Sequence, residues 1–297
     1  MVQSDRLTRR RFLETGVGAL AGMGVLGVAG CGNGAAGSQV DGKLKIALAN
    51  SFIGNSWRLE MENSYRAALG MEPYKSQVFG QVYNSSNDLS AQAQQLSNLV
   101  SAGVDAILID SASPTGLNGV VRQAVKRGIL VVSFDNIVTA QGALQVNTDQ
   151  FKFGKDLALW LVKQLKGKGN IIMVTGVPGT FVDVQRTAGG MSVFSKHPGI
   201  KIVNSYSGLW DSGVAQRNTA AVLPSLPKID GIWAQGGTDG VLKAFAAAGR
   251  PLPPTAGESE NGFRKFMAGD ENGKKLDGFS IGQPPYLVLL ALEAARR

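Results

Sequence analysis

The sequence predicts an α/β fold made of two doubly wound parallel-sheet domains of Rossmann-like type. Short apolar runs of strand length recur at 44–49, 105–109, 129–133, 171–175, 201–204 and 230–234. Stretches with helical spacing of apolar residues lie between them, at 88–102, 116–127, 151–166 and 237–248. Apolar strands that alternate with amphipathic helices are typical of a parallel sheet covered on both faces, wound by right-handed crossovers. About ten such units are too many for one compact sheet, so two similar domains are predicted instead of one.

Residues 1–30 predict an export signal that is not part of the fold. A basic start, LTRRRFLE, precedes the apolar stretch 16–30, which is too short to span a membrane. The segment 8–13 is similar to the twin-arginine export motif and departs from it at Glu14, where a lysine is more usual. The sequence VAGC, which ends at Cys31, is similar to a bacterial lipobox, in which the cysteine is lipid-modified and becomes the new N-terminus. A plain signal peptide with an incidental cysteine is the alternative.

Residues 31–42 are small and polar, which predicts a flexible tether between a lipid on Cys31 and the folded body. Cys31 is the only cysteine, so a disulfide within the chain is excluded. Beyond the N-terminus the sequence lacks an apolar run of about 18 residues, which argues against internal membrane spans. We therefore expect an exported protein in the periplasm or at the cell surface, anchored to the membrane by lipid.

The net charge of +8 does not indicate a nucleic-acid partner. Residues 1–30 contribute +2, from four arginines against Asp5 and Glu14, which leaves +6 for the rest of the chain. The remaining lysines and arginines are scattered, as expected of a solvated basic surface.

The two domains are predicted to meet at the sequence Asn147-Thr148-Asp149. It lies between the short strand ALQV and the helix FKFGKDLALWLVKQL. The first domain then covers 43–148 and the second begins at 149.

Polar and aromatic side chains gather where the predicted strands end. Ligands of open parallel sheets bind at the carboxyl ends of the strands, so the residues there are candidates for binding. They are amides, carboxylates, one glycine, one arginine and two large rings: Asn55, Trp57, Arg58, Asp135, Asn136, Trp210, Gly236, Asp239, Glu258, Glu260, Asn261 and Gln283.

Several kinds of chemistry lack the residues they need. His197 is the only histidine and lies in a turn-like segment, so a nucleophile with a histidine base is not indicated. One histidine and one cysteine cannot supply a zinc site, and the sequence has no P-loop motif. A glycosidase pair of Asp135 with Glu258 or Glu260 stays open. We expect no catalytic residue, metal or cofactor, and a neutral ligand with many hydroxyl groups.

Residues 43–297 resemble the ribose/galactose-type periplasmic sugar-binding proteins, the type I substrate-binding proteins of sugar ABC transporters. The resemblance is carried in order by IALANSFIGNSWR, SFDN, VNTD, AQGGTDG and IGQPP. It implies two domains joined by hinge crossovers, with 149–283 as the second domain and 284–297 returning to the first. It also implies a binding protein, not an enzyme, that captures a monosaccharide and delivers it to a membrane permease. A receptor that feeds a chemoreceptor or histidine kinase is the alternative.

Some of the family's ligand contacts fall on matching residues of this chain. The amide and the aromatic ring after the first strand fall on Asn55 and Trp57. The family's aspartate after the fourth strand falls on Asp135, its opposing ring on Trp210 and its crossing glutamine on Gln283.

Other positions depart from the family. Asn136 and Val184 stand where the family has arginines, Gly236 stands where it has an asparagine, and Arg58 is an addition. Arg186 falls on the family's neighbouring, more structural arginine. The usual ribose specificity is therefore not implied, and the sugar is left open.

A tryptophan beside an arginine in an exposed turn is explained if both face a sugar. Trp57 and Trp210 then cover the apolar faces of the ring. Arg58 and Asp135 bind its hydroxyl groups, each bond to a charged group contributing about 1.5–3 kcal/mol. In the alternative, Trp57 packs on the core and Arg58 is solvated.

The final sequence, PPYLVLLALEAARR, predicts a helix with Leu287, Leu290 and Leu292 as its apolar residues. In the resembling family another helix-and-strand unit of roughly 30 residues follows. We therefore expect this chain to be truncated or recorded short. A shortened but competent family member is the alternative.

Overall fold

The computed structural model describes residues 42–271 and 273–297. The predicted signal at 1–30, the lipidation site Cys31 and the tether up to residue 41 lie outside these residues. Within the described ranges, none of the helices has the length and apolar character needed to cross a membrane.

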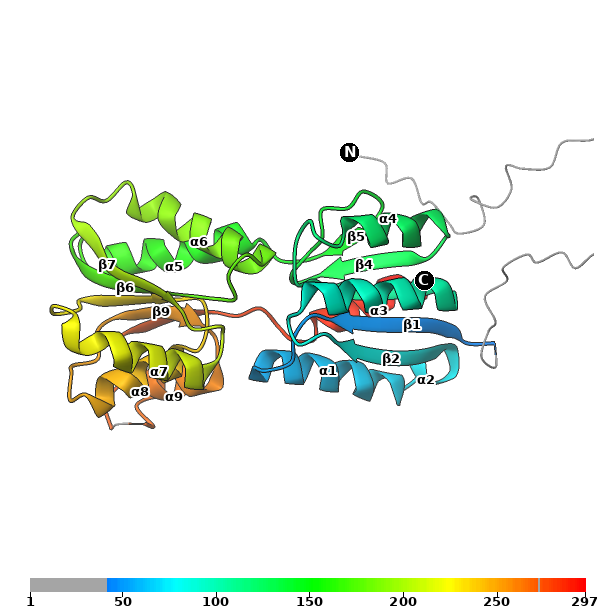
Figure 1. Ribbon diagram of the computed structural model, residues 1–297. Helices are drawn as coiled ribbons and strands as arrows, with labels where there is room; N and C mark the ends of the chain where they lie inside the picture. Colours follow the sequence, from blue (N-terminus) through cyan, green and yellow to red (C-terminus); the bar gives the residue numbers. More distant parts are fainter. Residues whose placement is uncertain (1–41, 272) are drawn as a thin grey trace, which may run out of the picture. The chain divides into compact units, whose positions relative to one another are not determined.

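The first half of the described chain forms a five-stranded sheet in the order β2-β1-β3-β4-β5 (Figure 1). Neighbouring strands pair in parallel throughout. The strands are β1 (Leu44–Asn50), β2 (Val78–Asn84), β3 (Ala106–Asp110), β4 (Leu130–Phe134) and β5 (Leu144–Val146).

A second parallel sheet follows, in the order β10-β9-β8-β6-β7. Its strands are β6 (Gly169–Thr175), β7 (Ile200–Ser207), β8 (Gly231–Ala234), β9 (Thr255–Glu258) and β10 (Gly278–Ile281). Two parallel sheets with flanking helices confirm the predicted fold class.

Helices connect the strands, and many begin where the sequence supplies a capping side chain. Asn55, Asp88, Asp149 and Asp211 each accept a hydrogen bond from a backbone N–H in the first turn of the helix that follows. The helices are α1 (Ser56–Leu69), α2 (Tyr74–Gln77), α3 (Leu89–Ala102), α4 (Asn118–Lys126), α5 (Gln150–Gln164), α6 (Phe181–Phe194), α7 (Ser212–Val222), the 3₁₀ helix η2 (Leu223–Ser225), α8 (Thr238–Ala247), α9 (Asn261–Ala268) and α10 (Leu287–Arg296).

Each sheet has its own hydrophobic core on both of its faces. Helices α1 and α10 pack on one face of the first sheet, and α3 and α4 pack on the other. Helices α5 and α6 cover one face of the second sheet, and α7, α8 and α9 cover the other. We call the first sheet with its helices the first lobe, and the second sheet with its helices the second lobe.

Helix α10 lies in the first lobe although it follows the second lobe in sequence. Its buried residues are Leu287, Val288, Ala291, Leu292 and Ala295. Of the three apolar residues named from the sequence, Leu287 and Leu292 are buried, and Leu290 is 56% exposed. The buried stripe instead uses two alanines, because they allow the helix to lie close to the strands.

Candidate functional site

The carboxyl ends of strands from both lobes meet at a cleft. Its inner pocket, of about 30 Å³, is lined by Asn55, Trp57, Arg58, Asp135, Val182, Arg186, Trp210, Glu258 and Gln283. A wider outer cleft of about 760 Å³ adjoins it and shares five of these residues, Asn55, Trp57, Trp210, Glu258 and Gln283. The outer cleft also includes Asp239, Glu260 and Asn261. Ten of the twelve predicted residues therefore line this cleft, and Asn136 and Gly236 lie outside its lining.

Trp57 belongs to the first turn of helix α1, which the side chain of Asn55 caps by accepting a bond from the Arg58 N–H at 2.8 Å. The ring of Trp57 is partly buried against the core of the first lobe and also lines the pocket. Its indole N–H donates to the carbonyl oxygen of Gln283 at 2.7 Å. The ring is therefore held at the cleft with one face against protein.

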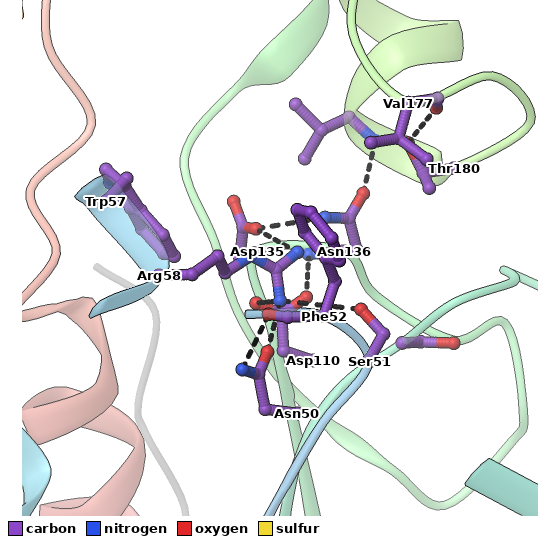
Figure 2. A network of polar contacts seen from close by, with 12 residues as sticks. Asn50, Ser51, Phe52, Trp57, Arg58, Asp110, Asp135, Asn136, Val177 and Thr180 are labelled. Atoms are coloured by element: carbon purple, nitrogen blue, oxygen red, sulfur yellow. Dashed lines mark hydrogen bonds and ion pairs between the residues drawn. The ribbon is translucent and has the colours of Figure 1, made fainter. Parts of the chain in front are cut away.

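Arg58 is buried, so the prediction of an exposed turn and the alternative of a solvated arginine are both wrong. Figure 2 shows its guanidinium among the ends of three strands of the first lobe. It donates to Asn50 Oδ1 at 2.5 Å, forms an ion pair with Asp110, and lies 3.4 Å from Asp135 Oδ2. Burial raises the pKa of Asp110, and the Arg58 charge opposes that rise. Arg58 thus lines the inner pocket and forms an ion pair with Asp135, which also lines it.

Asp135 and Asn136 follow strand β4 and make different contacts. Asp135 has a left-handed backbone, with φ of 53°. An aspartate tolerates this backbone conformation better than most residues do, and residues in this conformation are often found at functional sites. Its carboxylate lines the pocket and accepts from the side-chain amide of Gln283. Asn136 is almost fully buried, and its side chain contacts protein instead.

Gln283 lies on the segment that leads from β10 back to the first lobe. Its side-chain oxygen accepts from the Thr148 hydroxyl, on the other connection between the lobes, and from the amide of Gln150, the first residue of α5 after that connection. Its amide nitrogen donates to Asp135. One glutamine therefore connects both crossings to the pocket.

Arg186, on helix α6, forms the side of the pocket that belongs to the second lobe. Its side chain is 2% exposed, and its guanidinium lies over the ring of Phe153, 3.8 Å from the ring centroid. It donates to both oxygens of Glu258, at 3.0 and 3.3 Å, and to the Gln150 side chain at 2.8 Å. Burial raises the pKa of Glu258, and the charge of Arg186 counteracts this.

Trp210 provides the second ring of the cleft. Its backbone and that of Leu209 are left-handed, with φ of 55° and 54°, which is uncommon for bulky residues and costs free energy. The ring packs directly on Gly176, where an added Cβ would lie 2.0 Å from it. Gly236 lies on another side, so close that a Cβ there would be 3.0 Å from the ring. Both glycines make room for the indole.

Glu260 contributes a carboxylate with a perturbed pKa to the outer cleft. Its two oxygens accept from the N–H groups of Gly237 and Thr238, at 2.8 and 2.9 Å, at the start of helix α8. Burial, and then the charge of Glu258, raise its pKa to about 7. Asp239 lies nearby and forms an ion pair with Lys243 at 2.7 Å.

The cleft offers contacts for a small polar molecule. Among residues 42–271 and 273–297, no three His, Cys, Asp or Glu side chains are grouped to hold a metal ion. Two rings, two arginine–carboxylate pairs and two amides converge from both lobes on one space.

A family model described as a periplasmic binding protein domain matches residues 46–297. The chain belongs to this family. The resemblance found from the sequence motifs is therefore confirmed. A xylitol-binding protein of Mycolicibacterium smegmatis is 29% identical over 278 residues, which cover 89% of this chain and 76% of that protein. A D-ribose/D-allose-binding protein of Pseudomonas aeruginosa is 29% identical over 219 residues, or 70% of this chain and 68% of that protein.

A solved structure agrees with this assignment. An ABC transporter solute-binding protein from Thermobispora bispora superposes with a TM-score of 0.80 at 30% identity, covering 86% of this chain and 79% of that one.

The sequence did not indicate every residue of the pocket in this periplasmic binding protein. The family resemblance implies a structural role for Arg186, yet this residue lines the inner pocket, as does Val182. Asp110 was not singled out, although it is the polar end of an apolar strand. The rule that identified Asp135 would have found Asp110, whereas Arg186 and Val182 carry no comparable signal because they lie within a helix.

Proposed function

We propose that this periplasmic binding protein captures a monosaccharide or a related polyol in the cleft, outside the cytoplasm, and delivers it to an ABC importer. The observation that carries the proposal is the inner pocket, where Trp57 and Trp210 accompany two carboxylates that are each held by an arginine.

The rings suit the apolar part of such a ligand. The C–H groups of a sugar or polyol pack on the faces of indole rings, which bury large areas and lose little torsional freedom. Trp57 is fixed through its N–H to the Gln283 carbonyl, and Trp210 by its packing on Gly176. Both rings are therefore held in place by contacts within the protein.

The carboxylates suit the hydroxyl groups. Asp135 and Glu258 come from opposite lobes, and each can accept a bond from a ligand hydroxyl, worth about 1.5–3 kcal/mol when the acceptor is charged. Arg58 and Arg186 keep these carboxylates oriented. A ligand that contacts both sides favours the state in which the lobes close around it.

The volumes suggest where the ligand lies. The inner pocket of about 30 Å³ holds about one water molecule. The ligand body therefore belongs in the outer cleft of about 760 Å³, between the rings, and only one of its hydroxyl groups reaches the inner pocket.

The relatives support this class of ligand, because two that cover 70% or more of the chain are described as xylitol-binding and D-ribose/D-allose-binding proteins. Attachment through lipid on Cys31 belongs to the same proposal, and it rests on the VAGC sequence after the apolar stretch. Replacing Cys31 with alanine should release the protein from membranes, and unchanged membrane fractionation would argue against the anchor.

The binding proposal is tested by thermal unfolding with a panel of pentoses, hexoses, pentitols and sugar acids. A ligand present at roughly 100 times its Kd adds about 2.7 kcal/mol to the stability. The active compound should also change tryptophan fluorescence, and Trp57→Ala should remove most of the binding. Analysis of the recovered ligand should show it unchanged. A panel in which no sugar or polyol shifts the transition contradicts the proposal, and turnover of the ligand would indicate an enzyme.

A further inference from the structure

The first turn of helix α6 takes a hydrogen-bond acceptor from the opposite lobe. The helix begins at Phe181, and the backbone N–H of Val182 donates to the side-chain oxygen of Asn136 at 3.0 Å. Thr180 occupies the position where a capping side chain is usual, but its hydroxyl donates to the Val177 carbonyl at 2.8 Å. The helix of the second lobe is therefore capped by a residue of the first.

Asn136 is held in the orientation that this cap requires. Its side-chain nitrogen donates to Asp135 Oδ2 at 3.0 Å, which turns the oxygen toward helix α6. Its own backbone N–H lies 3.4 Å from Asp110 Oδ1 (Figure 2). The residue is 1% exposed. Both polar ends of the amide are therefore used within the protein.

The two partners of Asn136 lie on opposite sides of the inner pocket. Asp135 lines it from the first lobe, and Val182 and Arg186, on helix α6, line it from the second. Asn136 itself lies outside the lining. A single side chain thus connects the two ligand-facing walls without facing the ligand.

We propose that Asn136 is a positioning residue that latches the lobes together by capping helix α6 across the cleft. The latch holds both walls of the pocket in register before a ligand arrives. Ligand binding therefore has to supply less of the free energy that is needed to close the lobes. One neutral hydrogen bond of typical strength shifts such an equilibrium by about fivefold.

The test uses the protein without any added sugar, so its outcome does not depend on the proposed ligand. Asn136→Ala removes both contacts of the amide. In Asn136→Asp the new carboxyl lies against Asp135 Oδ2, so we expect it to hold a proton, donate that proton to Asp135 and still accept from the Val182 N–H. Asn98→Ala, on the exposed face of helix α3, is the matched control.

Amide hydrogen exchange at Val182, measured by NMR, reports the cap directly. We expect exchange at this site to become at least about fivefold faster in Asn136→Ala and to stay near wild type in Asn136→Asp and Asn98→Ala. The amide of Val184, which donates to the Thr180 carbonyl at 3.1 Å, serves as an internal reference. If Asn136→Ala does not fold, Asn136→Ser replaces it, because its side chain is too short to reach the helix.

Small-angle scattering then tests whether the cap holds the lobes. The radius of gyration should rise in Asn136→Ala but not in Asn136→Asp. Unchanged exchange at Val182, or an unchanged radius despite faster exchange, overturns the latch. Equal behaviour of the alanine and aspartate variants would show that an acceptor at position 136 does not restore the cap, and it also overturns the latch.

Discussion

Replacing Arg186 with methionine tests the charge balance of the pocket. Methionine retains much of the side-chain length and its packing on Phe153, but it removes the cation and the three kinds of contact that the guanidinium makes, to Glu258, to Gln150 and to the carbonyl of Gln235. Glu258, whose side chain is only 14% exposed, then remains without its charged partner.

The expected loss is large because the partner stays behind. Breaking a buried ion pair by removing one member costs about 3–5 kcal/mol, since an uncompensated charge remains in the protein. Burial already raises the pKa of Glu258, and loss of Arg186 should raise it further. A protonated Glu258 no longer needs the cation, so the loss should be smaller at acidic pH than at neutral pH.

Urea unfolding followed by circular dichroism measures the free energy of unfolding. Arg217→Met, at an exposed site on α7, is the control and should stay within about 0.5 kcal/mol of wild type. The double variant Arg186→Met/Glu258→Gln should recover more than half of the loss, because the stranded charge is gone. A loss below about 1 kcal/mol in Arg186→Met would refute this account, since it would mean that Glu258 does not depend on its pair.

Three further predictions concern packing and pH. Gly176→Ala should displace the Trp210 indole that packs on it, which lowers stability by about 1–3 kcal/mol and weakens ligand binding. Gly119→Ala, which has open space around it, should instead stabilise the protein by about 0.4–1 kcal/mol. Equal effects of the two substitutions in urea unfolding would contradict this prediction. Leu292→Ala should lower the free energy of unfolding by about 2–5 kcal/mol, because the side chain is fully buried. Leu290→Ala, at an exposed site, should lower it by about 0.5 kcal/mol or less. Similar losses in the two variants would show that α10 does not pack as described. Because the pKa of Glu260 is raised from 4.5 to about 7, its contribution to stability is present below pH 4.5 and lost as the pH rises through 7. The stability of Glu260→Gln should therefore depend less on pH than that of wild type, and parallel pH profiles would contradict the raised pKa.

The fold class could be predicted because most strands are buried on both faces and therefore appear as continuous apolar runs. Strand β3, with all five residues buried, is the clearest example. Strand β2 was missed because it lies at the sheet edge and only Val78 is buried, so its sequence, VFGQVYN, carries little apolar signal. The buried face of α10 was not predicted, because two of its five buried residues are alanines, which carry little apolar signal.

The site could be predicted only as far as local rules reach. Residues after the strands were found from position alone, and most of them line the cleft. The burial of Arg58 was not predictable, because it depends on Asp110, which lies 52 positions further along the chain. The contact of Asn136 with helix α6 depends on the other lobe. Such pairings are set by tertiary structure and leave no periodic pattern in the sequence.

The position of helix α10 has a consequence for how the protein folds. Its buried residues complete a core made by strands that end at Phe134, and Leu287 comes 153 positions after Phe134 in the chain. The second lobe, from Gln150 to Ile281, is continuous in sequence and depends on its own cores. We therefore expect the second lobe to acquire its native packing earlier, while the first lobe waits for a loop closure that spans the whole of its neighbour. During synthesis the first lobe would therefore begin to form first but would complete its packing last.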